Sequence, residues 1–249
     1  RTTDDTYLRR YQFSQDTLLT SSAFIETTNV IEGNDRNYAS ARALSFQGLT
    51  AEDDSERIPI VLPLAEFSYE SDPMRYNSRY FMGSNLMALT RDTGAKSRRL
   101  SMTGGWTLPY ITNDGQIVEF STQLRGDIYS VEDVLLAGGR QFDGTTGRLI
   151  PEASATWRYP FFNRIDEQTS LMIEPVVSAA ISPGGGNPEK IPNEDSLVPE
   201  FTDGNLFSPN RYAGYDRVET GPRVSYGLRG QVQLFSDKYV DWLFGQHYQ

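Results

Sequence analysis

Residues 117–128, IVEFSTQLRGDI, alternate between apolar and polar side chains along most of their length. The apolar face includes Phe120 and Leu124, and the polar face is formed by Glu119, Ser121, Gln123, Arg125 and Asp127. A period of two is typical of a β-strand with one buried face. A strand whose second face is charged needs water on that face, as on an open sheet or in the lumen of a membrane barrel.

The same alternation recurs on both sides of this stretch. Residues 99–110 precede it across the Asn-Asp-Gly turn in ITNDGQ, and residues 223–234 repeat the pattern later. Weaker strands are predicted at 3–12, 17–29, 37–48, 58–69, 79–90, 150–160, 170–181 and 241–248. Helical periodicity is nearly absent, and no run of about 18 apolar residues could form a membrane helix. The sequence therefore predicts an all-β, antiparallel protein of about eleven strands.

The connections between these strands predict on which side of a membrane each turn lies. Short connections are expected near 31–36, 71–78, 111–116, 161–169 and 237–240. Long connections are expected near 49–57, 91–98, 130–149 and 182–222. The connection near 13–16 is the exception, because it is short although it falls on the side where the other loops are long. Transmembrane barrels have short periplasmic turns and longer outer loops, and a soluble sandwich has no reason to segregate them. We therefore predict a segment of a transmembrane β-barrel.

The composition argues against several classes of function. The net charge is −10, which disfavours nucleic acid as a partner. There is no cysteine, and His247 is the only histidine, so a catalytic triad or a histidine metal site has little to build on. We expect Glu152 and Glu174 to pair with Arg158 and other arginines, and the acidic run at 52–56 to be a solvated loop. The sequence thus predicts a protein that is not an enzyme and holds no cofactor.

One segment carries a family resemblance. It is IPNEDSLVPEFTDGNLFSPNRYAGYDRVETGPRVSYGLR, residues 191–229. This segment resembles the long loop and following strand of the LptD family of lipopolysaccharide-assembly proteins, in particular the alphaproteobacterial members. Further stretches similar to the family lie in order at 4–11, 37–49, 58–69, 98–110 and 157–161. The motif residues to which a structural role is assigned are Asn193, Asp195, Ser196, Asn205, Phe207, Asn210, Arg211, Gly214, Asp216 and Arg217. We expect Asp216 and Arg217 to form pairs that order this loop over the lumen.

The resemblance implies a function. The family forms a large outer-membrane barrel with an N-terminal periplasmic jellyroll, receives lipopolysaccharide from periplasmic bridge proteins and inserts it into the outer leaflet without catalysis. A plug lipoprotein, LptE, occupies the lumen in many members. Residues 1–249 are expected to be a mid-barrel part of the C-terminal barrel domain, with a long outer loop at 182–222 and without the jellyroll or the first and last barrel strands.

The polar strand faces supply the candidate lumen residues, which would contact water, one another or the plug. These are Glu119, Gln123, Arg125, Arg158, Glu174, Arg229, Gln231 and Gln233. Three alternatives remain open from the sequence. A general porin or TonB-type barrel shares the alternation, a soluble β-sandwich would need the apolar strand faces to form one dry core, and an outer-membrane hydrolase would have to work with a single histidine.

Overall fold

The computed structural model describes residues 17–31, 33, 36–50, 53–167, 169–197, 202, 204–234 and 238–249. The chain forms one antiparallel sheet of eleven strands, accompanied by a short 3-10 turn, η1 (Arg75–Asn77). The strands are β1 (Leu18–Thr28), β2 (Asn37–Gly48), β3 (Ile60–Glu70), β4 (Arg79–Thr90), β5 (Lys96–Ile111), β6 (Ile117–Leu135), β7 (Gln141–Arg158), β8 (Phe161–Arg164), β9 (Thr169–Ile181), β10 (Arg223–Leu234) and β11 (Lys238–Tyr248). The predicted all-β antiparallel fold is confirmed.

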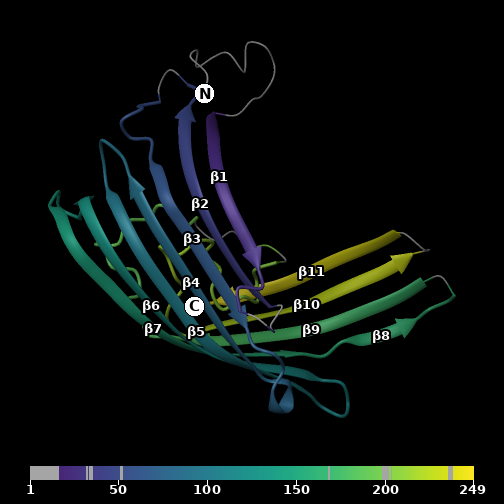
Figure 1. Ribbon diagram of the computed structural model, residues 1–249. Coiled ribbons are helices and arrows are strands. Elements are labelled where there is room, and N and C mark those ends of the chain that lie inside the picture. The colour runs from purple at the N-terminus through teal and green to yellow at the C-terminus, as the bar shows by residue number, and fades with distance from the viewer. Residues whose placement is uncertain are drawn as a thin grey trace.

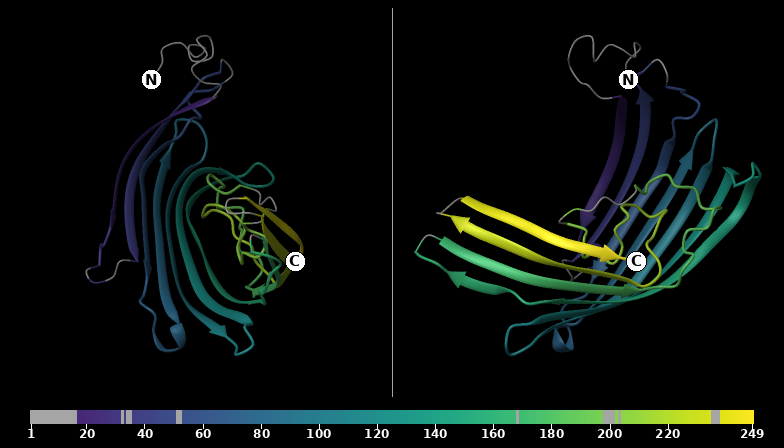
Figure 2. Two further views of the ribbon diagram at one scale, coloured as in Figure 1. Left: turned by 90° about the vertical axis from the view of Figure 1, so that its right-hand side faces the viewer. Right: turned by 180° about the vertical axis from the view of Figure 1, so that it is seen from behind.

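Neighbours in sequence are neighbours in the sheet. The order runs from β1 to β7 and on through β9 and β10 to β11, while the short β8 pairs beside β7 along β9. The sheet is strongly curved, so that β9–β11 cross the direction of β1–β4 (Figure 1). It forms an open trough, and the segment between β9 and β10 lies inside the curve (Figure 2). We call this inner side the concave face.

The two faces of the sheet differ as the alternation predicts. On the outward face, Leu100 pairs with Ile128, and these side chains are 41% and 60% exposed. One position along, Arg99 pairs with Tyr129 on the concave face, and both are buried. The apolar outward side chains are thus the exposed ones, and the polar concave side chains are the covered ones. This inversion of a soluble protein's pattern suits a sheet whose outer face meets lipid.

Aromatic side chains border the apolar outward face. At the end near the short turns, Tyr80 pairs with Trp106, and Tyr110 and Trp157 both pair with Val118. At the end near the long loops, the rings of Tyr226 and Tyr248 stack with centroids 6.1 Å apart. Two aromatic borders on one apolar face correspond to the girdles of transmembrane strands. No helix in the described part of the chain is long and apolar enough to span a bilayer.

Several sequence predictions need correction. The expected long loop at 130–149 is wrong, because β6 continues to Leu135, β7 begins at Gln141 and only the turn 136–140 joins them. A bulge between Val131 and Val134, with Asp133 at φ 61°, breaks the period of two and hid the strand. The connection expected at 91–98 is likewise only 91–95, and the connection expected at 161–169 contains β8. The long connections are therefore 49–59 and 182–222. The strand predicted at 3–12 lies outside the described residues.

Candidate functional site

The segment 182–222 folds back over the concave face (Figure 2). Its described part contains no helix or strand, so its backbone polar groups need other partners. Asn187 supplies one such replacement, since its side-chain amide donates to the Val218 carbonyl (2.8 Å) and accepts from the Val218 N–H (3.0 Å). The two ends of the segment are joined by a hydrogen bond from the Gly221 N–H to the Ser182 carbonyl (3.0 Å). We call residues 182–222 the inner loop.

A buried ion pair fixes the inner loop to the sheet. Arg99 of β5 lies 2.6 Å from Asp216 and 2.7 Å from Asp195, measured from Nη1 to the nearest carboxylate oxygens. The side chains of Arg99 and Asp216 are each 1% exposed. Asn85 of β4 accepts two further hydrogen bonds from the same guanidinium (3.2 and 2.7 Å). Charged hydrogen bonds of this kind are the strong ones, and a buried charge needs all of its partners.

The Asp216 carboxylate is saturated by donors from both sheet and loop. Tyr129 of β6 donates its hydroxyl to Oδ1 at 3.1 Å. The backbone N–H groups of Glu194 (2.8 Å) and Asp195 (3.2 Å) donate to Oδ2. Asp216 therefore joins three separate parts of the chain, namely β5, β6 and the turn at Glu194 and Asp195.

The Asp195 carboxylate binds the backbone of the turn at Gly214, Tyr215 and Asp216. It accepts from the N–H groups of Tyr215 and Asp216, each at 3.0 Å, and from the Ser196 hydroxyl at 3.0 Å. Burial alone would raise the pKa of Asp195. The Arg99 guanidinium and the two N–H groups outweigh burial and hold the pKa below its usual range. Asp195 is therefore charged in the folded protein at neutral pH.

Gly214 is required by this packing. Its φ is +84°, and a Cβ at this position would lie 2.4 Å from the Asp195 carbonyl oxygen. A side chain would therefore meet both backbone strain and a backbone clash. The close approach lets the 214–216 backbone reach the Asp195 carboxylate.

A second ionic centre lies on β6 and β7. Asp127 is buried between Arg125, with Nε at 3.0 Å, and Arg148, with Nε at 2.5 Å. Both arginines also donate to the Tyr215 carbonyl, and Arg148 donates to the Asp216 carbonyl at 3.0 Å. One buried carboxylate thus holds two guanidinium groups that bind the loop backbone.

The Tyr215 ring completes the contact between this centre and the first. The guanidinium carbons of Arg99 and Arg125 lie 5.0 and 5.3 Å from its centroid, within cation–π range. Burial is the largest of the causes that raise the pKa of its hydroxyl. The ring thus stays neutral while it bridges the two ionic centres.

The last part of the inner loop has its own anchors. Arg223 at the start of β10 forms an ion pair with Glu152 of β7, and donates to Ser182 Oγ at 3.1 Å. Arg211 and Glu219 form an ion pair within the loop. Burial would raise the pKa of Glu219, but hydrogen bonds and charge from Arg211 lower it overall. The loop is therefore fixed at both ends as well as at its middle.

The structure brings most of the motif residues predicted from the sequence into this assembly. Asn193 and Ser196 close a turn through hydrogen bonds of 2.7 and 3.1 Å. Asn205 accepts from the Thr202 N–H at 2.9 Å, and the ring of Phe207 lies 5.0 Å from the Arg229 guanidinium. Asn210 Oδ1 accepts from the Glu219 N–H at 3.0 Å. These contacts all order the inner loop or attach it to the sheet.

Arg217 is bonded in a different way from the expected one. It donates to the Ile191 carbonyl (3.0 Å) and to the Asp216 carbonyl (3.2 Å), so it ties the loop to itself through backbone oxygens. The ion pair of Asp216 is made instead with Arg99, a strand residue that the sequence analysis did not single out. Both residues order the loop, but only Asp216 attaches it to the sheet through an ion pair in the described residues.

The candidate lumen residues divide into covered and open ones. Gln123 donates to Glu152 at 2.7 Å, and Arg229 pairs in register with Glu174, with their charged atoms 4.0 Å apart. By strand register Glu119, Arg158, Gln231 and Gln233 lie on the same face, with Glu119, Arg158 and Gln233 exposed and Gln231 partly covered. Glu152 and Glu174 pair with arginines as expected, but the partners are Arg223 and Arg229 and not Arg158.

The acidic run at 52–56 is engaged with its surroundings where it is described. Asp53 accepts from the Thr50 N–H at 2.8 Å, Asp54 forms an ion pair with Arg57 at 3.4 Å, and Glu56 accepts from the Thr93 hydroxyl at 3.1 Å. Across the described residues, no group of three or more acidic, histidine or cysteine side chains has the arrangement to hold a metal ion. These contacts shape the loop 49–59.

A search of curated proteins finds no match. A family model described as LptD, LPS transport system D, matches residues 1–249. That family is a non-enzymatic lipopolysaccharide transport component of the outer membrane and forms a β-barrel. An antiparallel sheet with an apolar outward face and a polar, loop-filled concave face is the wall of such a barrel, and this chain belongs to the LptD family.

Proposed function

We propose that this chain forms part of the wall of an outer-membrane barrel that moves lipopolysaccharide to the cell surface and inserts it into the outer leaflet. The observation that carries the proposal is the family match along residues 1–249. The two-faced sheet supports it, because lipid can cover the apolar outward side while the polar side faces a lumen. Nothing in this role requires catalysis by the chain.

The inner loop acts as a fixed filling of the lumen in this proposal. Breaking one buried ion pair costs about 3–5 kcal/mol, because the remaining charge is left without its partner. The inner loop has such pairs at Asp216 and at Glu219, and Arg223 makes another at its end. A loop held in this way narrows the barrel permanently instead of swinging open with each transported molecule. The substrate then passes beside the loop.

The partners are part of the same proposal. A transport barrel needs a donor of lipopolysaccharide on the periplasmic side, and we assign that role to the bridge proteins of the transport system. The open concave residues Glu119, Arg158 and Gln233 are the candidate contacts for a plug lipoprotein such as LptE. Cross-linking from these three positions, compared with the covered Gln123, tests this assignment.

The test of the function is depletion of the full-length protein in its own host, followed by surface labelling of newly made lipopolysaccharide. We expect labelling to stop while other outer-membrane barrels still assemble. Normal labelling combined with a loss of solute uptake would overturn the proposal and favour a porin. Wild-type protein supplied from a second copy is the control that restores labelling.

A further inference from the structure

A hollow lies at the long-loop end of the outward face. Its volume is about 930 Å³, and it extends along the outer ends of β1–β6. One row of the sheet forms its floor, in which Ser21 pairs with Ser45, Ser45 with Ile60, and Ile60 with Thr90. This row shares the outward face with Leu100, because Leu86 lies four residues along β4 from Thr90, on the same face, and pairs with Leu100. We call this hollow the outer notch.

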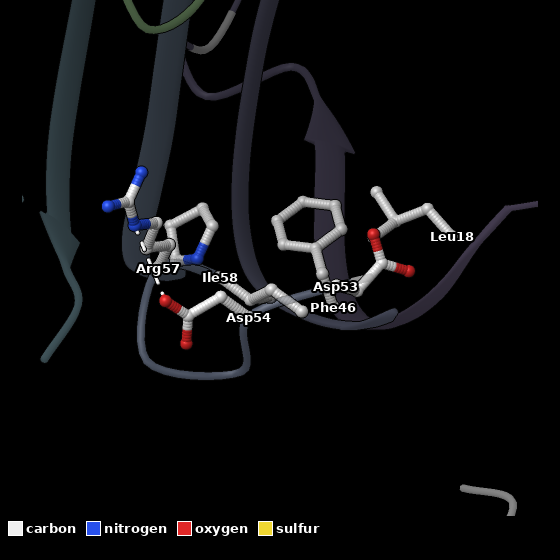
Figure 3. Close-up of a pocket in the computed structure, with 7 residues that line it drawn as sticks. Leu18, Phe46, Asp53, Asp54, Arg57 and Ile58 are labelled. Carbon is white, nitrogen blue, oxygen red and sulfur yellow. Dashed lines mark ion pairs between the residues drawn. The ribbon is translucent and has the colours of Figure 1, made fainter. Parts of the chain in front are cut away.

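Small side chains and an overhanging loop create the outer notch. Ser21 and Ser45 leave space in a row where the next strand carries the bulky outward side chain of Ile60. The loop 49–59 closes the notch from above with Asp53 and other residues. A second hollow of about 580 Å³ lies under the same loop and shares Phe46, Asp53 and Ile58 with the notch. Figure 3 shows the residues that line this second hollow.

The residues that line the outer notch combine three kinds of chemistry. Its cations are Arg91, which is paired with Glu194 of the inner loop, Lys96, which lies 3.9 Å from Asp133, and Arg98. Its carboxylates are Asp53, Asp92 and Glu132. Its neutral hydrogen-bonding groups include Ser21, Ser45, Gln47, Thr50, Ser55 and Thr90. Arginine and lysine bind phosphates, whereas carboxylate, amide and hydroxyl groups bind sugar hydroxyls. This mixture matches a phosphorylated sugar better than it matches a simple anion.

The position of the notch, just beyond the apolar band of the outward face, points to a lipid headgroup. On the outward face of β5, Met102 and Leu100 are exposed apolar residues and Arg98 is the next outward position. Arg98 is thus the first charge above the apolar band on this strand. Arg98 is exposed, and the described residues place no carboxylate within ion-pair distance of it. A guanidinium at this height can reach the phosphates of the outer leaflet.

We propose that the outer notch binds the phosphorylated sugar headgroup of a lipopolysaccharide molecule in the outer leaflet. Arg98 and Lys96 contact the phosphates, and the serine and carboxylate groups contact the sugar hydroxyls. The hollow is at the large end of the range for small-molecule sites, so a single phospholipid headgroup would leave most of it empty. The inference rests on the proposed function, since it takes the transported lipid as the ligand. The notch would hold that lipid on the outer wall after delivery.

The test is photo-cross-linking in the host with the full-length protein. A photoreactive amino acid replaces Ser45 in the notch or, as the matched control, Thr145 on β7. Thr145 lies on the same outward face in the register row of Arg98, because Arg98 pairs with Ser130 and Ser130 with Thr145, and it does not line the notch. We expect lipopolysaccharide to cross-link roughly tenfold more at position 45 than at position 145. Equal yields would mean contact with bulk lipid only and would overturn the proposal, as would cross-links at position 45 to phospholipid alone.

Charge reversal gives the second arm. Arg98→Glu should lower the yield at position 45 by roughly tenfold, the size expected for losing one charge-assisted contact. Arg140→Glu, on the exposed turn 136–140, changes the same charge outside the notch and should leave the yield unchanged. If Arg98→Glu has no effect while surface delivery of lipopolysaccharide still depends on the protein, the notch proposal fails and the proposed function stands.

Discussion

Arg99 and Asp216 lie 117 positions apart in the sequence, and their Nη1 and Oδ1 atoms are 2.6 Å apart in a buried ion pair. Asn85 and Tyr129 bind the same pair from β4 and β6. The pair therefore connects three adjacent strands with the inner loop. This ion pair is therefore the main attachment of the inner loop to the concave face.

Removing one partner of this pair should release the inner loop. Asp216→Ala leaves the Arg99 guanidinium buried with only Asp195 as a carboxylate partner, and we expect docking of the loop to weaken by about 3–5 kcal/mol. Limited proteolysis of the folded full-length protein, read at sites within 182–222, measures the release. Glu189→Ala removes an exposed acidic residue of the same loop and serves as the control. Protection equal to that of wild type in Asp216→Ala would contradict the role of the pair.

Arg217→Ala should have a smaller effect than Asp216→Ala. Arg217 donates to two loop carbonyls, and hydrogen bonds to a charged group contribute about 1.5–3 kcal/mol. We expect a partial increase in loop proteolysis and a mild weakening of the outer-membrane barrier, measured as uptake of a large antibiotic. The decisive comparison is which of the two variants has the faster proteolysis of the inner loop. An Arg217→Ala protein more open than Asp216→Ala would show that the loop's internal contacts dominate.

Gly214→Ala should disturb the turn at Asp195. The positive φ and the approach to the Asp195 carbonyl oxygen leave no room for a methyl group. We expect a cost of about 1–3 kcal/mol in loop docking, the usual size for a non-glycine residue held in such a conformation. Hydrogen exchange of the Tyr215 and Asp216 amides measures it. Gly184→Ala in the same loop meets open space and should exchange as wild type does.

The sequence predicts the faces of the strands but not the partners across the molecule. The alternation around Arg99 and Asp127 places each on a polar face, because a period of two is a local property of the strand. The contact of Arg99 with Asp216 depends on how a long loop returns, and no local pattern encodes that return. Arg148 escapes prediction for another reason, since residues 141–149, QFDGTTGRL, are rich in glycine and polar residues and resemble a loop although they form the first part of β7.

Acid should loosen the inner loop. The pKa values of Asp195 and Glu219 are lower in the folded protein than their usual values. Their contribution to stability is therefore fully present above the usual carboxylate pKa of about 4 and is lost as the pH falls through the lower, folded values. We expect proteolysis of the loop to rise below about pH 4. Glu219→Gln should flatten this pH dependence, and an unchanged profile would rule out Glu219 as a contributor.

The outward face of β6 sets the thickness of the apolar band. Val118 lies level with the aromatic residues Tyr110 and Trp157, and Ser130 lies level with Arg98. These two rows are separated by a strand that rises about 3.4 Å per residue and tilts by about 40° in such barrels, which gives roughly 30 Å along the membrane normal. That height is close to the apolar band of about 25 Å in outer-membrane barrels. Leu124 lies halfway between the rows and is thus near the bilayer midplane.

Neighbouring residues on β6 should therefore respond in opposite ways to the same substitution. Leu124→Arg places a charge in lipid at the midplane and should destabilise the folded barrel by about 2–4 kcal/mol. Gln123→Arg places the same charge on the concave face beside Glu152, to which Gln123 already donates, and should be tolerated. Unfolding of the full-length protein in lipid vesicles by denaturant measures both. Equal losses at the two positions would mean that the outward face of this sheet does not meet lipid, and the barrel wall would have to be assigned to the other side.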